Sequence, residues 1–438
     1  MNEITGLANG AAPATTAATT ENTAWPSAGH AARQAGAGWL AAALQASRQD
    51  TLATFASCAR GLVKLQVPQC STLNPPLWEL GHIGWFQDHW LGRNPQRKAG
   101  AAADPDAPRG PAARVLADAL YDSSKVAHAS RWSLALPDVA STQADLAAQL
   151  AHTLALLQAA DTTDDALYFF RLALLHEDMH HEAALYMAHS LGLAIDDGRW
   201  QAQPLPDTRQ TLQLPAGGWT LGNSDCGFAF DNELSAHQVA LPACQIDSQV
   251  LRWADYLPFV EAGGYSQPQW WADEARAWLA AGQPRCPRYT RRVGSPAPHW
   301  QRWQQGQWQA LDLGLPACHL TAFEADAWCR WAGRRLPTEA EWERAAVSLQ
   351  ASPQTDQQTS PPAFHWGQVW EWTASPFVPY PGFRPHPYRD YSAPWFGGHR
   401  VLRGASHLTQ PRLRHPRYRN FFVPQRNDVP AGFRSCSL

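Results

Sequence analysis

His176 and His180 stand four residues apart, within the stretch Leu-Leu-His-Glu-Asp-Met-His-His-Glu that begins at residue 174. On a helix this spacing places both imidazoles on one face, one turn apart. Neutral imidazole nitrogens held in this way are good ligands for a divalent metal. The pair therefore predicts half of a metal site, and at least one more ligand must come from elsewhere in the chain.

The best candidate for the third ligand is His82, in the motif Glu79-x-x-His82. Helical bundles build metal sites from side chains on facing helices, and the surrounding sequence is helical in pattern. The alternative is that His82 only packs beside Trp78 and Trp85. Because His82 and the histidine pair fall on two amphipathic helices of one predicted bundle, we predict that His82 is a ligand. Glu79, one turn earlier, is placed to orient an imidazole N–H.

Other polar residues fit the ligand set poorly. His181 lies about 100° round the helix from His180, and His89 lies roughly 10 Å along the axis from His82. His189 is also too far from the pair, so we expect these three histidines to be structural or surface residues. The acidic residues near the pair lie off the shared face, namely Glu177, Asp178 and Glu182.

Three neutral imidazoles with open positions suit Zn²⁺, and they equally suit Fe²⁺ that must bind a substrate and O₂. Ligand spacing alone does not choose between the two metals.

The elements that must position these residues fall in the first half of the chain. A chain of 438 residues is too long for one ordinary domain, so we expect two domains plus tails. Residues 1–35 have almost no large apolar side chains, which predicts a disordered leader. Residues 36–204 are predicted to form an antiparallel helical bundle. Its helical patterns span 37–61, 76–92 and 163–192, and a fourth pattern begins at Ser141.

Residues 205–438 have a different pattern, rich in Gly, Pro and Trp, and predict an α+β domain. Two helices stand out there, at 251–262 and 321–333. Strand-sized runs occur at 210–214, 218–221, 238–241 and 399–402.

The net charge, the apolar runs and the cysteine distribution exclude some classes of function. The net charge of −3 gives no case for nucleic acid or an anionic membrane as a partner. No apolar run reaches membrane-spanning length, and the eight cysteines are dispersed, as expected of reduced thiols in a cytoplasmic protein. The 22 tryptophans suit aromatic-lined pockets.

Two motif sets carry a family resemblance over about residues 37–438. Residues 75–86 and 176–182, Pro-Pro-Leu-Trp-Glu-Leu-Gly-His-x-x-Trp-Phe and His-Glu-x-x-His-x-Glu, resemble the DinB-like helical domain of the iron-dependent sulfoxide synthases of ergothioneine biosynthesis. Four later stretches are similar to the formylglycine-generating-enzyme domain, at 336–346, 369–373, 401–406 and 431–434. The resemblance implies an antiparallel DinB-like four-helix bundle followed by an α+β domain of C-type-lectin-like fold.

The second domain raises formylglycine generation as a rival function. Enzymes of that kind bind copper through a closely spaced cysteine pair near the C-terminus. The matching stretch here, 415–420, has no cysteine, and Cys436 stands alone. The sequence therefore argues against that chemistry.

The resemblance to the sulfoxide synthases implies an Fe²⁺ site made of His82, His176 and His180. Members bind hercynine, the trimethylated betaine of histidine, at the iron and use O₂ to join its imidazole ring to a thiol. A quaternary ammonium cannot be satisfied by hydrogen bonds, so aromatic faces should surround it. Asn420 and Phe421 match family positions next to that cation.

The segment Pro-Tyr-Arg-Asp-Tyr at 387–391 matches the one that holds the family's active-site tyrosine. By this resemblance Tyr388 would deliver a proton, or gate electron transfer, at the metal, and Tyr391 would line the substrate pocket. A tyrosine with an ordinary pKa near ~10 is a neutral acid at pH 7. The alternative is that both rings only pack in a Trp-rich loop.

Three positions bear on the second substrate. Members that use γ-glutamylcysteine carry an acid and an arginine after the Arg-Asn dipeptide; here Arg426 is present, but Phe422 stands at the acid position. Met179 stands where those members often have Gln. The motif around His82 is closest to the selenoneine synthases, a branch that joins hercynine to a selenosugar through a C–Se bond.

We therefore expect an O₂-dependent, non-haem iron oxidoreductase acting on hercynine and a selenosugar. The first alternative is a C–S-forming sulfoxide synthase that uses cysteine or γ-glutamylcysteine. The alternatives of another class are a zinc-dependent thiol transferase, as other DinB-like bundles can be, and a non-catalytic sugar-binding protein.

Overall fold

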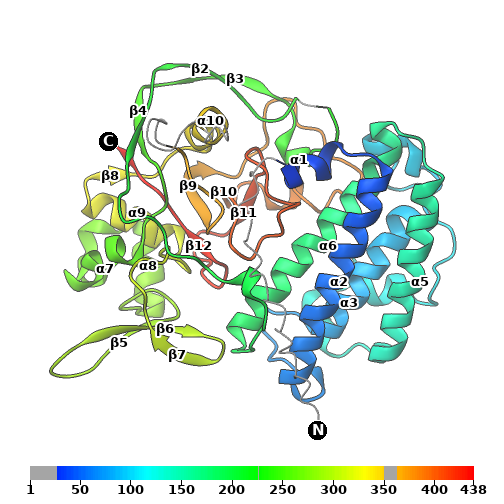
Figure 1. Cartoon of the computed structure of the whole chain (residues 1–438), viewed down its shortest axis with the longest axis horizontal. Coiled ribbons are helices and arrows are strands. Elements are labelled where there is room, and N and C mark those ends of the chain that lie inside the picture. Colours follow the sequence, from blue (N-terminus) through cyan, green and yellow to red (C-terminus); the bar gives the residue numbers. More distant parts are fainter. Residues whose placement is uncertain (1–26, 225, 350–362) are drawn as a thin grey trace, which may run out of the picture.

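The computed structural model describes residues 27–224, 226–349 and 363–438. Long helices from the first half of the chain lie on one side of the molecule, and short strands mixed with helices lie on the other (Figure 1). The predicted division into a helical part and an α+β part is confirmed at this level.

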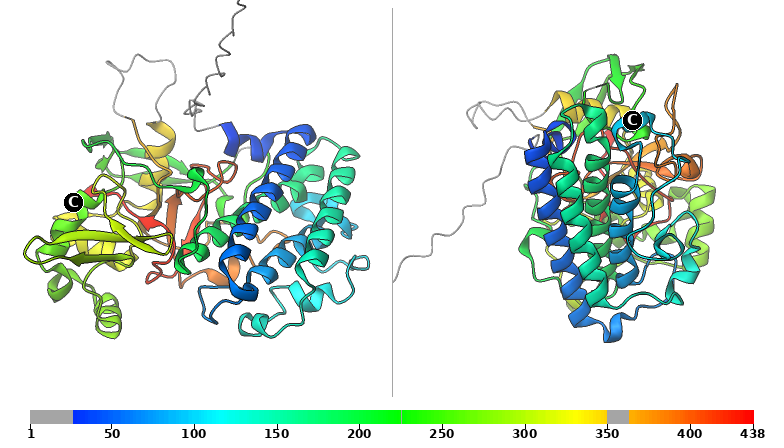
Figure 2. Two further views of the ribbon diagram at one scale, coloured as in Figure 1. Left: turned by 60° about the horizontal axis from the view of Figure 1, so that its bottom comes forward. Right: turned by 90° about the vertical axis from the view of Figure 1, so that its right-hand side faces the viewer.

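Four helices of the first half pack against one another, and the views in Figure 2 show them running side by side. They are α2 (Ala37–Gly61), α3 (Pro76–Gln87), α5 (Val139–Gln158) and α6 (Asp164–Ser190). Pro76 opens α3, where its missing N–H costs nothing. The predicted start of α5 at Ser141 is wrong, because Asp138 caps that helix and accepts from the Ser141 amide at 2.7 Å.

Helix α1 (Ser27–Gln34) lies within the segment predicted to be disordered, so that prediction is wrong for these residues. Arg33 supplies the physical reason: it is 3% exposed and pairs with Glu233 of the second half at 2.6 Å. This ion pair with a residue 200 positions away helps to offset the entropy cost of ordering the helix, which the local composition alone would not do. The rest of the predicted leader, residues 1–26, lies outside the described residues.

The described residues of the second half form two four-stranded sheets and two smaller ones. One sheet has the order β1-β4-β13-β8, formed by Thr211–Leu214, Cys244–Asp247, Cys436–Ser437 and Arg334–Arg335. The other has the order β11-β10-β9-β12, formed by Asn420–Phe422, Arg400–Gly404, Trp370–Pro376 and Ala431–Gly432. The smaller sheets pair β2 (Gly217–Leu221) with β3 (His237–Leu241), and β6 (His299–Gln304) with β5 (Thr290–Val293) and β7 (Gln307–Ala310).

All four predicted strand runs overlap observed strands, and the two predicted helices appear as α7 (Trp253–Glu261) and α9 (Ala322–Trp331). The prediction that only two helices stand out here is wrong, since α8 (Asp273–Gly282) and α10 (Glu339–Ser348) also form. The start of α10 had a readable signal: Thr338 and Glu341 form a reciprocal capping box.

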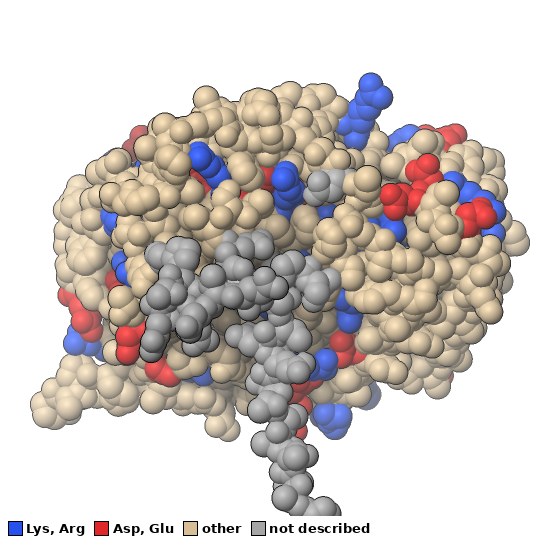
Figure 3. Space-filling view, turned by 45° about the horizontal axis from the view of Figure 1, so that its top comes forward, with Lys and Arg blue, Asp and Glu red and all other residues tan. Residues whose placement is uncertain are grey.

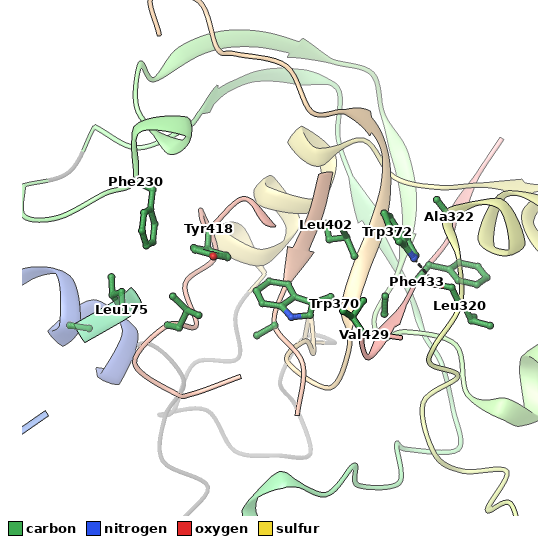
Figure 4. Close-up of a cluster of buried hydrophobic side chains, with 14 of the residues drawn as sticks. Leu175, Phe230, Leu320, Ala322, Trp370, Trp372, Leu402, Tyr418, Val429 and Phe433 are labelled. Carbon is green, nitrogen blue, oxygen red and sulfur yellow. Dashed lines mark hydrogen bonds between the residues drawn. The ribbon is translucent and has the colours of Figure 1, made fainter. Parts of the chain in front are cut away.

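One cluster of buried side chains crosses between the two halves. Figure 4 shows Leu175 of α6 on one side and Trp370, Trp372 and Phe433 on the other, with Tyr418 between. A shared core of this kind fixes the helical part against the strands. On the face drawn in Figure 3, basic and acidic side chains are interspersed, in keeping with the small net charge of −3. No helix among the described residues is long and apolar enough to cross a membrane.

Candidate metal centre and adjoining pocket

The structure brings His82, His176 and His180 together. One potential ligand atom from each imidazole lies within 4.8 Å of the others, and no other such group occurs among the described residues. His82 comes from α3, and the pair comes from α6, where the spacing of four places both rings on one face. The ring centroids are 4.4 Å apart for His176 and His180 and 4.8 Å apart for His82 and His180.

Two of the three imidazoles are oriented through Nδ1. His82 Nδ1 donates to the Tyr121 carbonyl oxygen at 2.8 Å, and His180 Nδ1 donates to Glu79 Oε2 at 2.5 Å. Gly81 permits the first bond, because a Cβ there would lie 2.3 Å from the Tyr121 ring. These bonds fix tautomers that leave Nε2 unprotonated and able to bind a metal.

His176 provides a direct test of fit to a metal ion. Its Nε2 is buried and has no hydrogen-bond partner. An orphaned buried nitrogen is costly unless something binds it, and a divalent cation shared with His82 and His180 would do so. The donor set therefore fits a metal with three histidine ligands.

The electrostatics of the site also suit metal binding. Burial and the nearby His180 lower the pKa of His82 to about 3, and burial holds the pKa of His176 well below its ordinary value. Both rings are thus neutral at pH 7 and can act as ligands. Burial alone would raise the pKa of the Glu79 carboxyl, but His180 and His82 lower it below its ordinary value. Glu79 is therefore a carboxylate directly behind one ligand.

The polar residues expected to stay outside the triad do so. Glu177 pairs with Arg48 at 2.8 Å, and Asp178 pairs with Arg412 at 2.8 Å. The three other histidines have neighbours of their own: His181 bonds Thr54, His89 packs against Trp85 and Trp90, and His189 stacks on His319.

A pocket of about 680 Å³, including its open mouth, lies between α6 and the second half. Its wall contains five of the six residues predicted to bind substrate, namely Met179, Tyr391, Asn420, Phe421 and Phe422. Three of these form strand β11, whose pairing with β10 sets Phe421 opposite Val401. Arg426 is absent from the wall. Its guanidinium lies over the Phe422 ring, 4.5 Å from the centroid, and bonds Asp428 Oδ1 at 3.0 Å.

Tyr388 lies edge-on to His176, with 6.0 Å between ring centroids, and to Phe86, at 5.0 Å. Burial raises the pKa of Tyr388 well above its ordinary value, so the hydroxyl holds its proton at neutral pH. The structure therefore brings Tyr388 beside His176, one of the three candidate ligands. It lies next to the pocket wall that Tyr391 forms, at 6.1 Å from that ring.

The loop that carries both tyrosines is fastened by Asp231, a residue that the sequence did not suggest. Asp231 is 3% exposed and accepts from the His386 amide at 3.3 Å and from Ser392 Oγ at 2.5 Å. These contacts fall on either side of Tyr388. A further bond of 2.9 Å joins His386 Nδ1 to the hydroxyl of Tyr168 on α6, the helix of the histidine pair.

Glu182 is the second residue that sequence reasoning missed. It lies off the metal face, as predicted, but it lines the pocket. Its Oε1 accepts from Trp370 Nε1 at 2.8 Å, Ser406 Oγ at 2.7 Å and Thr409 Oγ1 at 2.8 Å, and the described residues place no donor on Oε2. Burial raises the pKa of the Glu182 carboxyl above its ordinary value. All three donors come from the second half, so the local sequence held no signal for this role.

The fold and the site together define a class: a helical part that carries a three-histidine site, joined to an α+β part that covers it. The DinB superfamily model matches residues 43–184, and the sulfatase-modifying factor enzyme 1-like domain matches residues 197–363. The formylglycine-generating enzyme of Streptomyces coelicolor is 28% identical over 46% of this chain and 79% of its own length.

Relatives that span both parts identify the family. The hercynine oxygenase of Mycolicibacterium smegmatis is 32% identical over 416 residues, which is 83% of this chain and 90% of that protein. The hercynine oxygenase of Mycobacterium tuberculosis is 32% identical over 406 residues, with the same coverage of both chains. The chain belongs to the hercynine oxygenase family.

Proposed function

We propose that this protein is an iron(II), O₂-dependent enzyme that joins the imidazole ring of hercynine to a selenosugar through a C–Se bond. The observation that carries the proposal is the set of three histidines, two buried and one half-buried, beside Tyr388. Tyr388 in turn contacts Tyr391, which lines an aromatic pocket containing one buried carboxylate. The family relatives, named for hercynine oxygenation, support the first substrate.

Hercynine would bind in the pocket between α6 and strand β11. Its trimethylammonium group has no N–H to donate, so it is best stabilised by aromatic faces and a nearby negative charge. Trp370 and Tyr418, with ring centroids 5.6 Å apart, supply the faces, and Oε2 of Glu182 supplies the charge. A bound cation would favour the ionised form of Glu182 and so offset the effect of burial on its pKa. Tyr391 and Asn420 complete this wall.

His82, His176 and His180 would hold the metal. Fe²⁺ bound there would supply the one-electron chemistry that O₂ requires, which Zn²⁺ cannot. The neutral imidazoles and the Glu79 carboxylate behind His180 would keep the ligands oriented. Tyr388, whose hydroxyl is protonated at neutral pH, would act as the acid beside His176.

The surroundings of Arg426 support a donor other than γ-glutamylcysteine. The guanidinium is occupied by Asp428 on one side and by the Phe422 ring on the other. It is therefore not free to receive a substrate carboxylate, and Phe422 cannot pair with a substrate ammonium. Met179 accepts a weak bond from Tyr418 at 3.4 Å in the same wall. A neutral, hydroxylated selenosugar fits such a wall better than an amino acid does.

We also propose the finer architecture. Residues 36–204 form a DinB-like antiparallel four-helix bundle, and residues 205–438 form a C-type-lectin-like domain.

The test compares donors. Iron-loaded protein is mixed anaerobically with hercynine and a selenosugar, cysteine or γ-glutamylcysteine, and products are identified by mass spectrometry after O₂ is added. We expect a C–Se product with the selenosugar and little product with the thiols. Phe422→Asp restores the acid position and should raise turnover with γ-glutamylcysteine.

Product from a thiol alone would instead favour a C–S-forming sulfoxide synthase. A protein that binds zinc and consumes no O₂ with any donor would contradict the oxygenase proposal and favour a thiol transferase.

A further inference from the structure

A second cleft lies at the C-terminal end of α6, where the turn between β6 and β7 meets that helix. The approach is close: a Cβ on Gly306 would lie 2.5 Å from the carbonyl oxygen of Gly192. The cleft contains about 840 Å³ of empty space, part of it open to solvent. We call it the hairpin cleft and define it by His189, Arg288, Tyr289, Arg302 and His319.

The charge of the hairpin cleft is one-sided. Arg288 and Arg302 line it, and the described residues of its wall include no Asp or Glu. Arg302 makes no side-chain hydrogen bond or ion pair within the described part of the chain, and its Nε is buried without a partner. Arg288 donates only to Asn427 Oδ1, at 3.3 Å. The fully buried arginines of the described chain are paired, as Arg48 is with Glu177, whereas Arg302 is half-buried and its side chain has no partner there. Unpaired guanidinium groups in a cleft are suited to an anionic ligand.

The aromatic rings of the cleft hold further unused polar atoms. His189 and His319 stack in parallel with centroids 4.9 Å apart, and the Tyr289 ring stands perpendicular to both. His189 Nε2 and His319 Nδ1 have no hydrogen-bond partner. Leaving such atoms unpaired is costly, so a ligand that engages them after a small shift of the rings would be favoured.

The backbone supports a functional role for these residues. Tyr289 has φ +62° and His319 has φ +61°, a conformation that bulky side chains rarely adopt. Strain of this kind persists where the surroundings enforce it, often at ligand sites. The rest of the wall offers hydroxyl-binding amides and aromatic surface, from Gln201, Gln304, Gln305, Trp200 and Trp303.

We propose that the hairpin cleft binds a small anion carried on a hydroxylated body, the class of sugar phosphates and sugar acids. The two arginines would bind the phosphate or carboxylate, and the histidines and glutamines would bind hydroxyls. His189 lies nine residues beyond His180, or roughly 13 Å along the helix axis. The cleft is therefore a site separate from the metal centre, and the proposal does not rest on the reaction proposed above.

The test is calorimetric titration of the full chain, without metal loading, at low salt. The probes are glucose 6-phosphate, glucuronate, glucose and inorganic phosphate. We expect one or both anionic sugars to bind at least about tenfold more tightly than glucose. A preference for glucose 6-phosphate would assign the phosphate as the anchor, and a preference for glucuronate would assign the carboxylate.

Arg302→Gln should weaken binding of the preferred probe by about tenfold or more. Arg292→Gln is the matched control, because Arg292 lies on β5 of the same sheet, is exposed and does not line the cleft. Arg288→Gln, at an exposed position, gives a second variant should Arg302→Gln fold poorly. Anionic sugars that bind no better than glucose, or both cleft variants binding as the wild type does, would overturn the proposal. Inorganic phosphate binding as tightly as glucose 6-phosphate would overturn the part assigned to the hydroxylated body.

Discussion

The candidate site has two walls that are held in different ways. On the helical wall, His82, His176 and His180 are placed by regular spacing, and their orienting bonds run to Tyr121 and Glu79 of the same half. On the loop wall, Tyr388 and Tyr391 sit in an irregular segment fastened by the buried carboxylate of Asp231. On the helical wall the spacing of the ligands is therefore set by local helix geometry, and only their orienting bonds join residues distant in sequence. The loop wall has no regular element, and its position depends on contacts with the distant residues Asp231 and Tyr168.

This difference suggests a division of labour. Changes behind the helical wall should alter how tightly metal is bound, because the orienting bonds set ligand geometry and basicity. Changes behind the loop wall should alter turnover and leave metal binding intact, because they displace groups that we propose act on the substrate. Measuring metal affinity and turnover separately on matched variants tests the division.

The largest effect is expected from removing a ligand. His176→Ala should abolish stoichiometric Fe²⁺ binding and lower activity by more than about a hundredfold, since two imidazoles cannot replace three. Metal content after dialysis and O₂ uptake with hercynine provide the measurements. His152→Ala, at an exposed position on α5, is the control and should retain both properties. Full iron binding by His176→Ala would refute the ligand assignment.

Tyr388→Phe tests the loop wall directly. The ring contacts with Phe86 and His176 remain, and only the hydroxyl is lost. Loss of a positioned acid costs about 10²–10⁴-fold in rate, so turnover should fall by at least about a hundredfold. Metal affinity, measured by titration, should not change. Unchanged turnover would show that Tyr388 only packs in its loop.

Glu79→Gln should weaken Fe²⁺ binding by about 10–100-fold, because a neutral amide replaces the carboxylate behind His180. Glu177→Gln is the matched control: Glu177 stands beside a ligand but bonds Arg48 and Gln87 instead of an imidazole. The control should lose stability and keep its metal affinity. Equal metal affinities for the two variants would contradict the role assigned to Glu79.

The two walls also differ in how far the sequence predicted them. The spacing of His176 and His180, and of Glu79 and His82, follows from helix geometry, so a local pattern was enough. Glu182 was correctly placed off the metal face, but its pocket role depends on Trp370 and residues beyond it that only the fold brings near.

Asp231 is a second residue whose role depends on a contact that the local sequence does not reveal. Nothing in its neighbourhood indicates that it meets a loop 155 residues later. The helix at Arg33 was missed for the same reason, since its partner Glu233 is still more remote, 200 residues along the chain. Helix α10 differs from these cases, because its Thr338 and Glu341 capping signal was local and readable.

The smallest effect, and the one that best separates the walls, is expected from Asp231→Asn. The amide keeps one acceptor oxygen, so the loop should stay folded. Asn at position 231 should nevertheless bond the His386 amide and Ser392 more weakly than the carboxylate does. A slight displacement of Tyr388 should lower kcat by about tenfold, with little change in metal affinity. Asp326→Asn serves as the control, because Asp326 pairs with Arg400 of β10 at 2.7 Å and bonds neither His386 nor Ser392. If Asp231→Asn instead weakened iron binding and left kcat unchanged, the two walls would not be separable, and the metal ligands would depend on the loop that faces them.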